Sequence, residues 1–386
     1  MTTRRKIRMG MVGGGRGAFI GGVHRMGAAL DGQIELVCGA FSSDPEKSKA
    51  SGADLFLPAD RCYGTYEEMF IAEATLSADQ RMDLVSIVTP NHMHFAPCMM
   101  ALDYGFHVIC DKPLCLTLEE AHQISEKVKS GDRIFALTHA YTGYPMVKQA
   151  RHMIARGDLG KIRRVVVEYP QGWLSTALEN TDQKQASWRT DPSKSGAAGA
   201  MGDIGTHAEN LAEYVSGIKI DLVCADLHTH IPGRRLDDDG SVLLRFDNGA
   251  RGVLIASQIS AGEENNLRLK IYGEYGGIEW SQMEPNSLIV RWLDKPMEVY
   301  RTGVGNLSLE AQFHTRVPAG HPEGYLEAFA NIYRNVAFCI QVRLTGEEVN
   351  PIYLDFPGVD DGVRGMEFIE AVVGSGKDEH VKWYSV

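Results

Sequence analysis

The chain has 386 residues, of which 44% are hydrophobic, and its formal net charge is −11. This length exceeds one ordinary domain and predicts two, while the acidic balance argues against a nucleic-acid partner. No apolar run approaches the roughly 18 residues that a membrane span needs, so we expect no membrane partner. The opening MTTRRKIRMGMVG lacks the apolar core of a signal peptide, which predicts a cytoplasmic protein.

The first 140 residues alternate strand-like and helix-like segments, a pattern typical of a parallel sheet with helices on both faces. We expect strands over 6–12, 34–40, 84–88, 107–110 and 134–138, and helices over 20–30, 44–51, 66–74, 95–104 and 118–130. The sequence therefore predicts a doubly wound α/β domain of the Rossmann type over residues 1–140. Ligands of such sheets bind beyond the carboxyl ends of the strands, so the loops after the strands indicate where function lies.

Residues 141–386 have a different pattern, in which longer segments alternate apolar and polar side chains. We expect strands over 162–169, 221–230, 241–245, 251–260, 266–272, 277–282 and 287–293, and helices over 146–155, 205–217, 322–343 and 358–373. This predicts an α+β domain with a large, mostly antiparallel open sheet. The last helix is expected to pack back on the N-terminal domain.

The glycine-rich stretch GGGRGAFIGG lies between the first predicted strand and the first predicted helix, the place of a dinucleotide-binding loop. Its spacing departs from G-x-G-x-x-G, because the sixth position is Ala18 and the next glycine in the helix is Gly21. We interpret it as a lengthened pyrophosphate loop, in which backbone N–H groups of residues 16–20 face the phosphates and Arg16 adds a charge. The cofactor contacts expected here are Gly13, Gly15, Arg16, Gly17, Ala18, Phe19 and Ile20.

The loop after the second predicted strand reads Phe41-Ser42-Ser43-Asp44, where an NAD site usually has an acidic residue for the ribose hydroxyls. Asp44 comes slightly late, and it serves equally well as the N-cap of the next helix. Ser42, Ser43 and Lys47 are alternatively suited to a 2′-phosphate. The choice between NAD and NADP therefore stays open.

Two further loops follow the third and fourth predicted strands. The first contains Thr89, Pro90, Asn91, His92 and His94, which we expect beside the nucleotide. An H-x-H pair without a third ligand is a weak metal signal, so no metal is expected. The second loop, Asp111-Lys112-Pro113, places a lysine at a strand end, where desolvation and a neighbouring positive charge lower the pKa of an amine toward that of a general acid or base.

A fifth segment, Gly202-Asp203-Ile204-Gly205-Thr206-His207, belongs to the second domain. Asp203 and His207 are four residues apart, so on a helix they share one face. Such a pair can bind a metal, cap a helix or transfer a proton, and the sequence alone leaves these roles open.

Together, four segments in this order resemble the Gfo/Idh/MocA family, named for glucose–fructose oxidoreductase and inositol dehydrogenase. They are the glycine loop ending in His24, Thr89-Pro90-Asn91-His92, Asp111-Lys112-Pro113 and Gly202–His207. The resemblance covers nearly the whole chain. It departs from the family in a loop three residues longer before His24 and in Asp111, where glutamate is commoner.

The resemblance implies an oxidoreductase that uses NAD or NADP to oxidise or reduce a carbon of a sugar or cyclitol. It implies Lys112, Asp203 and His207 as the catalytic residues, with Asp111 and Lys112 beside the cofactor. Removing hydride from an alcohol carbon also requires that the hydroxyl proton leave, and a histidine suits that transfer near neutral pH. A homodimer or homotetramer is expected by analogy alone.

Polar and aromatic side chains elsewhere suit a sugar-like substrate. Besides the catalytic residues, the expected substrate contacts are His139, Tyr141, Tyr144, Trp188, Arg189 and His321. Packing is the alternative role for Tyr141, Tyr144 and Trp188. Two alternative functions also remain: an NAD-dependent glycoside hydrolase on the same fold, and a non-catalytic regulator that binds the cofactor.

Overall fold

The computed structural model describes residues 5–386. The chain forms two compact units: the first contains the residues up to Ala140 together with Leu326–Val363, and the second contains Tyr141–Tyr325 with Arg364–Val386. The segment 326–363 thus belongs to the first unit, and most of the last helix belongs to the second. The sequence pattern placed residues 141–386 in the second domain and expected only the last helix to pack back on the first. Local patterning cannot reveal such a return, because it depends on which distant surface a helix covers.

The first unit is built on a five-stranded parallel sheet with the order β2-β1-β3-β4-β5, as the sequence predicts for a Rossmann-type fold. Its strands are β1 (Ile7–Gly13), β2 (Ile34–Ala40), β3 (Leu84–Val88), β4 (His107–Cys110) and β5 (Phe135–Leu137). Every residue of β3, β4 and β5 is buried, which is the signature of a sheet covered on both faces.

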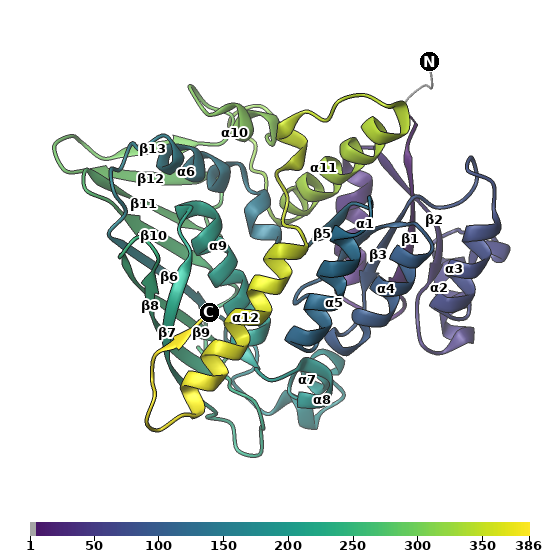
Figure 1. Cartoon of the computed structure of the whole chain (residues 1–386), viewed down its shortest axis with the longest axis horizontal. Helices are drawn as coiled ribbons and strands as arrows, with labels where there is room; N and C mark the ends of the chain where they lie inside the picture. Colours follow the sequence, from purple (N-terminus) through teal and green to yellow (C-terminus); the bar gives the residue numbers. More distant parts are fainter. Residues whose placement is uncertain (1–4) are drawn as a thin grey trace. The chain divides into compact units, whose positions relative to one another are not determined.

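Helices connect these strands along the chain, and one long helix from late in the sequence, α11, packs in the same unit (Figure 1). The helices of this unit are α1 (Ile20–Leu30), α2 (Pro45–Asp54), η1 (Ala59–Arg61), α3 (Tyr66–Thr75), η2 (Asn91–Met93), α4 (Phe95–Asp103), α5 (Leu118–Lys129), most of α11 (Tyr325–Thr345) and η6 (Pro351–Leu354). Helix α11 lies beside α1, where a Cβ on Gly27 would be 3.0 Å from the Cβ of Phe329. Glycine thus permits the close approach of these two helices.

The second unit contains a nine-stranded sheet with the order β13-β12-β11-β10-β6-β9-β8-β7-β14. Its strands are β6 (Arg164–Pro170), β7 (Ile220–His228), β8 (Asp239–Phe246), β9 (Arg251–Ser257), β10 (Arg268–Tyr272), β11 (Gly276–Ser281), β12 (Ser287–Trp292), β13 (Glu298–Arg301) and β14 (Tyr384–Ser385). The described pairings are antiparallel except β6 with β9, which is parallel. The mostly antiparallel sheet is therefore confirmed, and the two short edge strands are additions to it.

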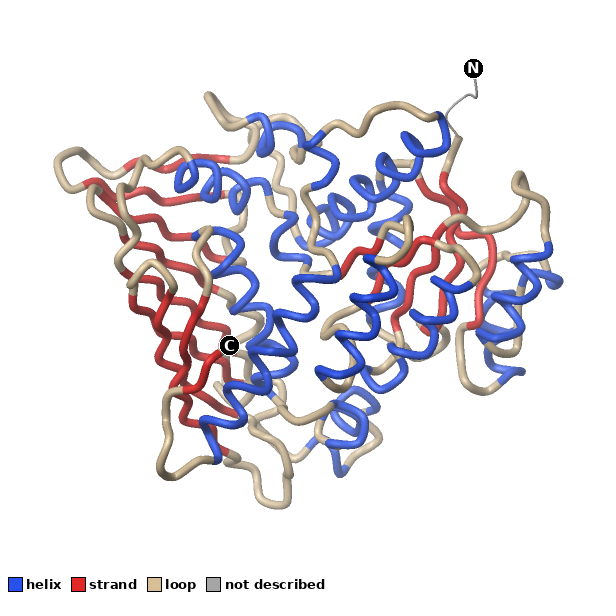
Figure 2. Tube along the Cα trace, in the orientation of Figure 1, coloured by secondary structure: helices blue, strands red, loops and turns tan. Residues whose placement is uncertain are grey.

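Figure 2 shows α6 and α9 packed on one face of this large sheet. The helices of the second unit are η4 (Leu178–Asn180), α6 (Pro145–Ala155), α7 (Lys184–Arg189), α8 (Pro192–Ser195), η5 (Met201–Gly205), α9 (Thr206–Ser216) and α10 (Leu309–Phe313). Two helical segments pass from one unit to the other along the chain, η3 (Ala140–Gly143) and α12 (Val359–Lys377). Across residues 5–386 we find no helix long and apolar enough to cross a membrane.

Candidate active site

The glycine loop joins β1 to α1 through two consecutive residues with positive φ, Gly13 at 83° and Gly14 at 73°. Gly21, the second residue of α1, lies directly on this bend, and a Cβ there would overlap the Cα of Gly14. A side chain at position 21 would therefore displace the loop. Because of this close contact, the position that must be glycine is 21, and position 18 can carry an alanine.

The start of α1 fits an anionic ligand such as a pyrophosphate. Its N-cap is Phe19, which is exposed and makes no side-chain capping hydrogen bond, and the first turn has no acidic residue. The first N–H groups of a helix have no partner within the helix, and its dipole favours negative charge at this end. The residues present therefore fit the phosphates of a dinucleotide.

Not every N–H group of the lengthened loop faces a ligand. The Arg16 N–H donates to Ser51 Oγ at 3.1 Å, and the Ala18 N–H donates to the Gly15 carbonyl at 3.0 Å. For these two groups the expectation from the sequence is wrong, because they hold the loop itself. The Arg16 side chain forms a bidentate pair with Asp54 on the surface, at 2.6 and 2.8 Å.

The turn after β2 carries the residues expected at the adenosine end of the cofactor. The Gly15 N–H donates to the Phe41 carbonyl at 3.1 Å, which joins this turn to the glycine loop. Asp44 is the N-cap of α2, since its Oδ1 accepts the N–H groups of Glu46 and Lys47 at 3.0 and 3.1 Å. Ser42 is partly exposed and Ser43 and Lys47 are exposed. The capping role of Asp44 is confirmed, and a separate acidic residue does not follow β2.

His94 connects the loop after β3 to the loop after β4. It is fully buried, and its Nδ1 and Nε2 each lie 2.9 Å from a backbone carbonyl, those of Pro113 and Thr89. Burial lowers the pKa of this imidazole. Both ring nitrogens therefore face the protein, and His94 positions the two loops. Of its predicted neighbours, His92 is exposed, while Asn91 is buried and Thr89 and Pro90 are partly so.

Asp111 and Lys112 follow β4 directly. The Asp111 Oδ1 atom accepts the Lys112 N–H at 2.9 Å and the Thr138 hydroxyl at 2.7 Å. Burial alone would raise the pKa of Asp111, but His24, Lys112 and Thr138 together hold it below its usual value. His139 is buried nearby, and desolvation followed by the charge of Lys112 lowers its pKa to about 3. The first unit thus presents a lysine whose backbone is fixed by an ionised carboxylate.

In the second unit, Asp203 lies in the π-helical turn η5, immediately before α9. Its Oδ2 atom accepts hydrogen bonds from Gln258 Nε2 at 2.8 Å and Arg189 Nε at 3.2 Å. The guanidinium of Arg189 lies 4.2 Å from the ring centre of Trp188 and 5.9 Å from that of Trp173. The predicted residues Trp188, Arg189 and Asp203 are therefore neighbours, and Trp188 holds the arginine.

His207 lies on α9 and is 9% exposed. The Tyr141 ring contacts the imidazole edge-on with centroids 4.8 Å apart, and Tyr169 lies at 6.3 Å. The hydroxyls of these two tyrosines are hydrogen-bonded to each other, and Tyr169 also donates to Asn265 Oδ1 at 2.7 Å. The ring of Tyr144 stacks on that of Tyr141 with centroids 6.3 Å apart, and its contact with substrate stays a prediction.

A group of polar and aromatic side chains in this unit was not predicted from the sequence: Tyr169, Gln171, Trp173, Gln258 and Asn265. Gln171 links them, donating to Asn265 Oδ1 at 2.5 Å and accepting the Trp173 indole N–H at 3.0 Å. Gln171 directly follows β6 and Gln258 directly follows β9, the two parallel strands of the sheet. The strand-end rule applies there too, but the sequence pattern did not reveal which two strands of the mostly antiparallel sheet are parallel.

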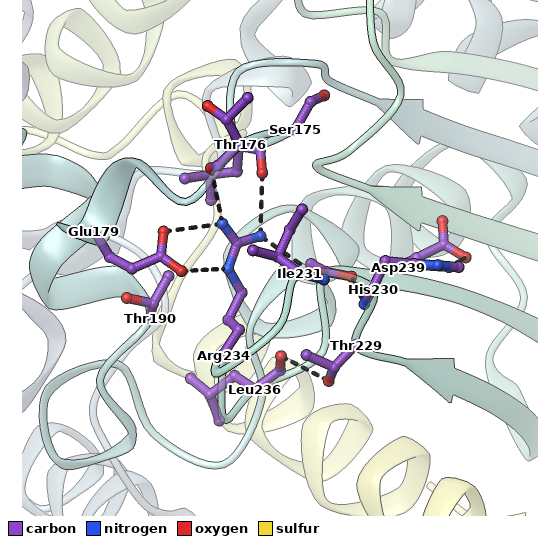
Figure 3. A network of polar contacts seen from close by, with 12 residues as sticks. Ser175, Thr176, Glu179, Thr190, Thr229, His230, Ile231, Arg234, Leu236 and Asp239 are labelled. Atoms are coloured by element: carbon purple, nitrogen blue, oxygen red, sulfur yellow. Dashed lines mark hydrogen bonds and ion pairs between the residues drawn. The ribbon is translucent and has the colours of Figure 1, made fainter. Parts of the chain in front are cut away.

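Buried charges fix the loops that carry these residues. Arg234 binds both Glu179 carboxylate oxygens at 2.9 Å, and it donates to the carbonyls of Leu174 and Thr176 (Figure 3). A few residues on, Asp237 accepts the N–H groups of Gly199 and Met201 at 2.6 and 2.8 Å. The segment 229–239 therefore anchors both the loop after Trp173 and the turn that carries Asp203.

His321 precedes α11 in the second unit. It is exposed, and its Nδ1 contacts the Pro318 carbonyl at 3.0 Å. Its role in substrate binding stays a prediction. A search of residues 5–386 finds no group of three or more side chains arranged to hold a metal ion.

A glycine loop that fits phosphates in a parallel sheet, and an Asp–His motif beside polar and aromatic side chains, are the features expected of a dinucleotide-dependent oxidoreductase. Two family models match the chain: the oxidoreductase family with an NAD-binding Rossmann fold over residues 7–139, and the GFO/IDH/MocA C-terminal domain over residues 147–279. The chain belongs to the Gfo/Idh/MocA oxidoreductase family, as its motifs indicate.

Relatives and solved structures agree with this assignment. The uncharacterized oxidoreductase YfiI of Bacillus subtilis is 34% identical over 96% of this chain and 94% of its own length. A levoglucosan dehydrogenase of Pseudarthrobacter phenanthrenivorans is 28% identical over 74% of this chain and 76% of its own. The structure of an inositol dehydrogenase homolog from Azotobacter vinelandii, complexed with NAD⁺, has a TM-score of 0.93 at 34% identity and covers 99% of this chain and 98% of that one.

Proposed function

We propose that this protein is an NAD(P)-dependent dehydrogenase that transfers hydride between the nicotinamide and a ring hydroxyl carbon of a sugar, anhydrosugar, glycoside or cyclitol. The observation that carries the proposal is the environment of Asp203 and His207, which is lined by amide, phenol and indole side chains. Amides and phenols can pair with hydroxyl groups, and indoles can stack on the C–H faces of a ring. The similarity to an inositol dehydrogenase homolog and to a levoglucosan dehydrogenase also supports the proposal.

The chain's own residues divide the work of alcohol oxidation as follows. A ring nitrogen of His207 accepts the hydroxyl proton, and the Lys112 ammonium donates a hydrogen bond to the oxygen that becomes a carbonyl. Asp203 orients the substrate, and its carboxylate is held in place by Arg189 and Gln258. When bound, the nicotinamide supplies the hydride acceptor, and the protein supplies position and charge.

The first unit would hold the cofactor through the bend at Gly13 and Gly14 and the uncapped start of α1. At the adenosine end, Ser42, Ser43 and Lys47 provide hydroxyls and one cation, and the carboxylates of this turn are the cap Asp44 and the exposed Glu46. This composition is compatible with a ribose hydroxyl or a 2′-phosphate, so both NAD⁺ and NADP⁺ belong in the assay. We further propose a cytoplasmic homodimer or homotetramer, by analogy with the family.

The test is a panel of pyranoses, 1,5-anhydrosugars, glycosides and inositols, each assayed with NAD⁺ and with NADP⁺ for the appearance of reduced cofactor. The proposal predicts steady reduction with at least one uncharged polyol. Chromogenic glycosides run in parallel as the matched control. Cleavage of a glycoside without net reduction of any cofactor would instead establish the hydrolase, and cofactor binding with neither reaction would establish the regulator.

A further inference from the structure

Three buried polar side chains of the first unit have no place in the proposed reaction. His24 on α1, Ser86 on β3 and Tyr333 on α11 are each 0% exposed. Uncompensated polar groups are costly in such surroundings, so their partners indicate what they do. They come from three separate parts of the sequence and meet at one point under the carboxyl end of the parallel sheet.

The Tyr333 hydroxyl joins the other two. It lies 2.7 Å from His24 Nδ1 and 2.7 Å from Ser86 Oγ. The opposite nitrogen, His24 Nε2, is buried without a hydrogen-bond partner and lies 3.8 Å from Asp111 Oδ1. The tyrosine and serine thus fix one side of the imidazole, and the other side faces the carboxylate that accepts the Lys112 N–H.

The groups that face Asp111 can be sorted by charge. They are His24 on α1, His94 after η2, Tyr333 on α11, Cys110 and Lys112 on its own segment, and Thr138 and His139 after β5. Burial lowers the pKa of His94 and His139 and raises the pKa of Cys110 and Tyr333, so these four are neutral near pH 7. Thr138 is neutral at any pH. The remaining groups that face the carboxylate are Lys112, whose N–H it accepts at 2.9 Å, and His24, whose Nε2 lies 3.8 Å from Asp111 Oδ1.

We propose that His24, held by Tyr333 and Ser86, is a positioning residue that fixes the Asp111 carboxylate beside Lys112. The role of Lys112 on which this rests is that of the proposed function. Asp111 holds the lysine backbone through one hydrogen bond, so its charge determines how firmly the lysine is presented. His24 acts through Asp111 and touches neither substrate nor cofactor in this account.

The direct test measures the titration of Asp111 itself by NMR, with ¹³C in the aspartate carboxyl groups and with Asp111→Asn to assign the signal. His24→Gln keeps a hydrogen-bonding side chain but removes the imidazole, and Tyr333→Phe keeps the ring and removes only the hydroxyl. We expect the Asp111 midpoint to rise by about one pH unit in His24→Gln and by a smaller amount in Tyr333→Phe. Tyr63→Phe is the control, since it removes a phenol bonded to the Glu73 carboxylate at 3.0 Å in the same unit.

A kinetic arm connects the network to turnover. With any polyol that reduces the cofactor, kcat should fall in His24→Gln and by less in Tyr333→Phe, in the same order as the Asp111 midpoint rises, while the Kd for NAD⁺ stays within about threefold. A merely structural role would lower kcat without moving the Asp111 midpoint. An unchanged Asp111 midpoint in both His24→Gln and Tyr333→Phe would overturn the inference. If no polyol reduces the cofactor, the proposed function fails, and the NMR arm still decides the role of His24.

Discussion

His107 and His139 are two histidines of the first unit that burial keeps neutral. Each is less than a tenth exposed, and burial lowers the pKa of each from 6.5 to about 3. The neutral form is built into the structure at His107, whose Nδ1 accepts the Ile134 N–H at 2.8 Å. An unfolded chain would protonate both near their ordinary pKa, so acid favours unfolding through them.

This difference predicts how stability depends on pH. Between pH 6.5 and 3 the unfolded state binds more protons at these sites, so their contribution is complete above pH 6.5 and is lost as the pH falls. The free energy of unfolding should decrease by about 2 kcal/mol per histidine from pH 7 to pH 5. Urea unfolding of His107→Gln should show a shallower pH dependence than the wild type, while His122→Gln, at an exposed position of α5, should not. Equal slopes in all three proteins would contradict this account.

At this scale the sequence indicated candidate residues but not the contacts that they make. Asp203, His207 and Lys112 lie at strand ends or a helix start because short motifs specify them. Gln171 and Gln258 were missed, because their proximity depends on the parallel pairing of β6 with β9. His94 was expected beside the nucleotide, but its ring faces two backbone carbonyls, which only the folded loops reveal.

At the scale of elements, the junction of β1 and α1 explains the irregular glycine spacing. The bend at Gly13 and Gly14 leaves room for a helix start only if the residue above it has no side chain, and that residue is Gly21. The strands and helices around it followed from periodicity, and α1 and β2 have the predicted bounds. The π-helical turn that carries Asp203 could not be predicted in this way, because no local propensity distinguishes it from the helix that follows.

Adjacent glycines of α1 provide a matched pair of variants. Gly21→Ala places a Cβ against Gly14, so the phosphate loop must move, and we expect NAD⁺ affinity to fall at least about tenfold. Gly22→Ala meets nothing within 4 Å, so it should leave affinity unchanged and raise the free energy of unfolding by about 0.5–1 kcal/mol. Calorimetric titration with NAD⁺ measures the first effect and urea unfolding the second. Equal affinities in the two variants would remove the Gly21–Gly14 contact from the cofactor site.

At the scale of the whole molecule, the chain crosses more than once between its two compact units. Helix α11 returns to the first unit and supplies Tyr333, and most of α12 belongs to the second. The class of each unit was evident from the sequence, because βα repeats and alternating strands differ in period. The return of α11 to the first unit was not evident, since the spacing of its apolar residues does not indicate which sheet they cover.

The proposed catalytic residues also come from both units, with Lys112 in the first and Asp203 and His207 in the second. Neither unit alone should therefore catalyse the reaction, although the first has the features of a cofactor site. The central claim is that, during hydride transfer, His207 accepts the hydroxyl proton and Lys112 donates a hydrogen bond to the oxygen that becomes a carbonyl.

The most direct test of that claim is the turnover number for cofactor reduction by the best polyol of the panel, measured for Lys112→Ala and His207→Ala. Each variant should lose at least about 10²-fold in kcat, the usual scale for an acid–base group, while NAD⁺ binds within about threefold of the wild type. Lys127→Ala, which removes a partly exposed lysine paired with Asp103, is the control. Near-normal turnover in either catalytic variant would contradict the account.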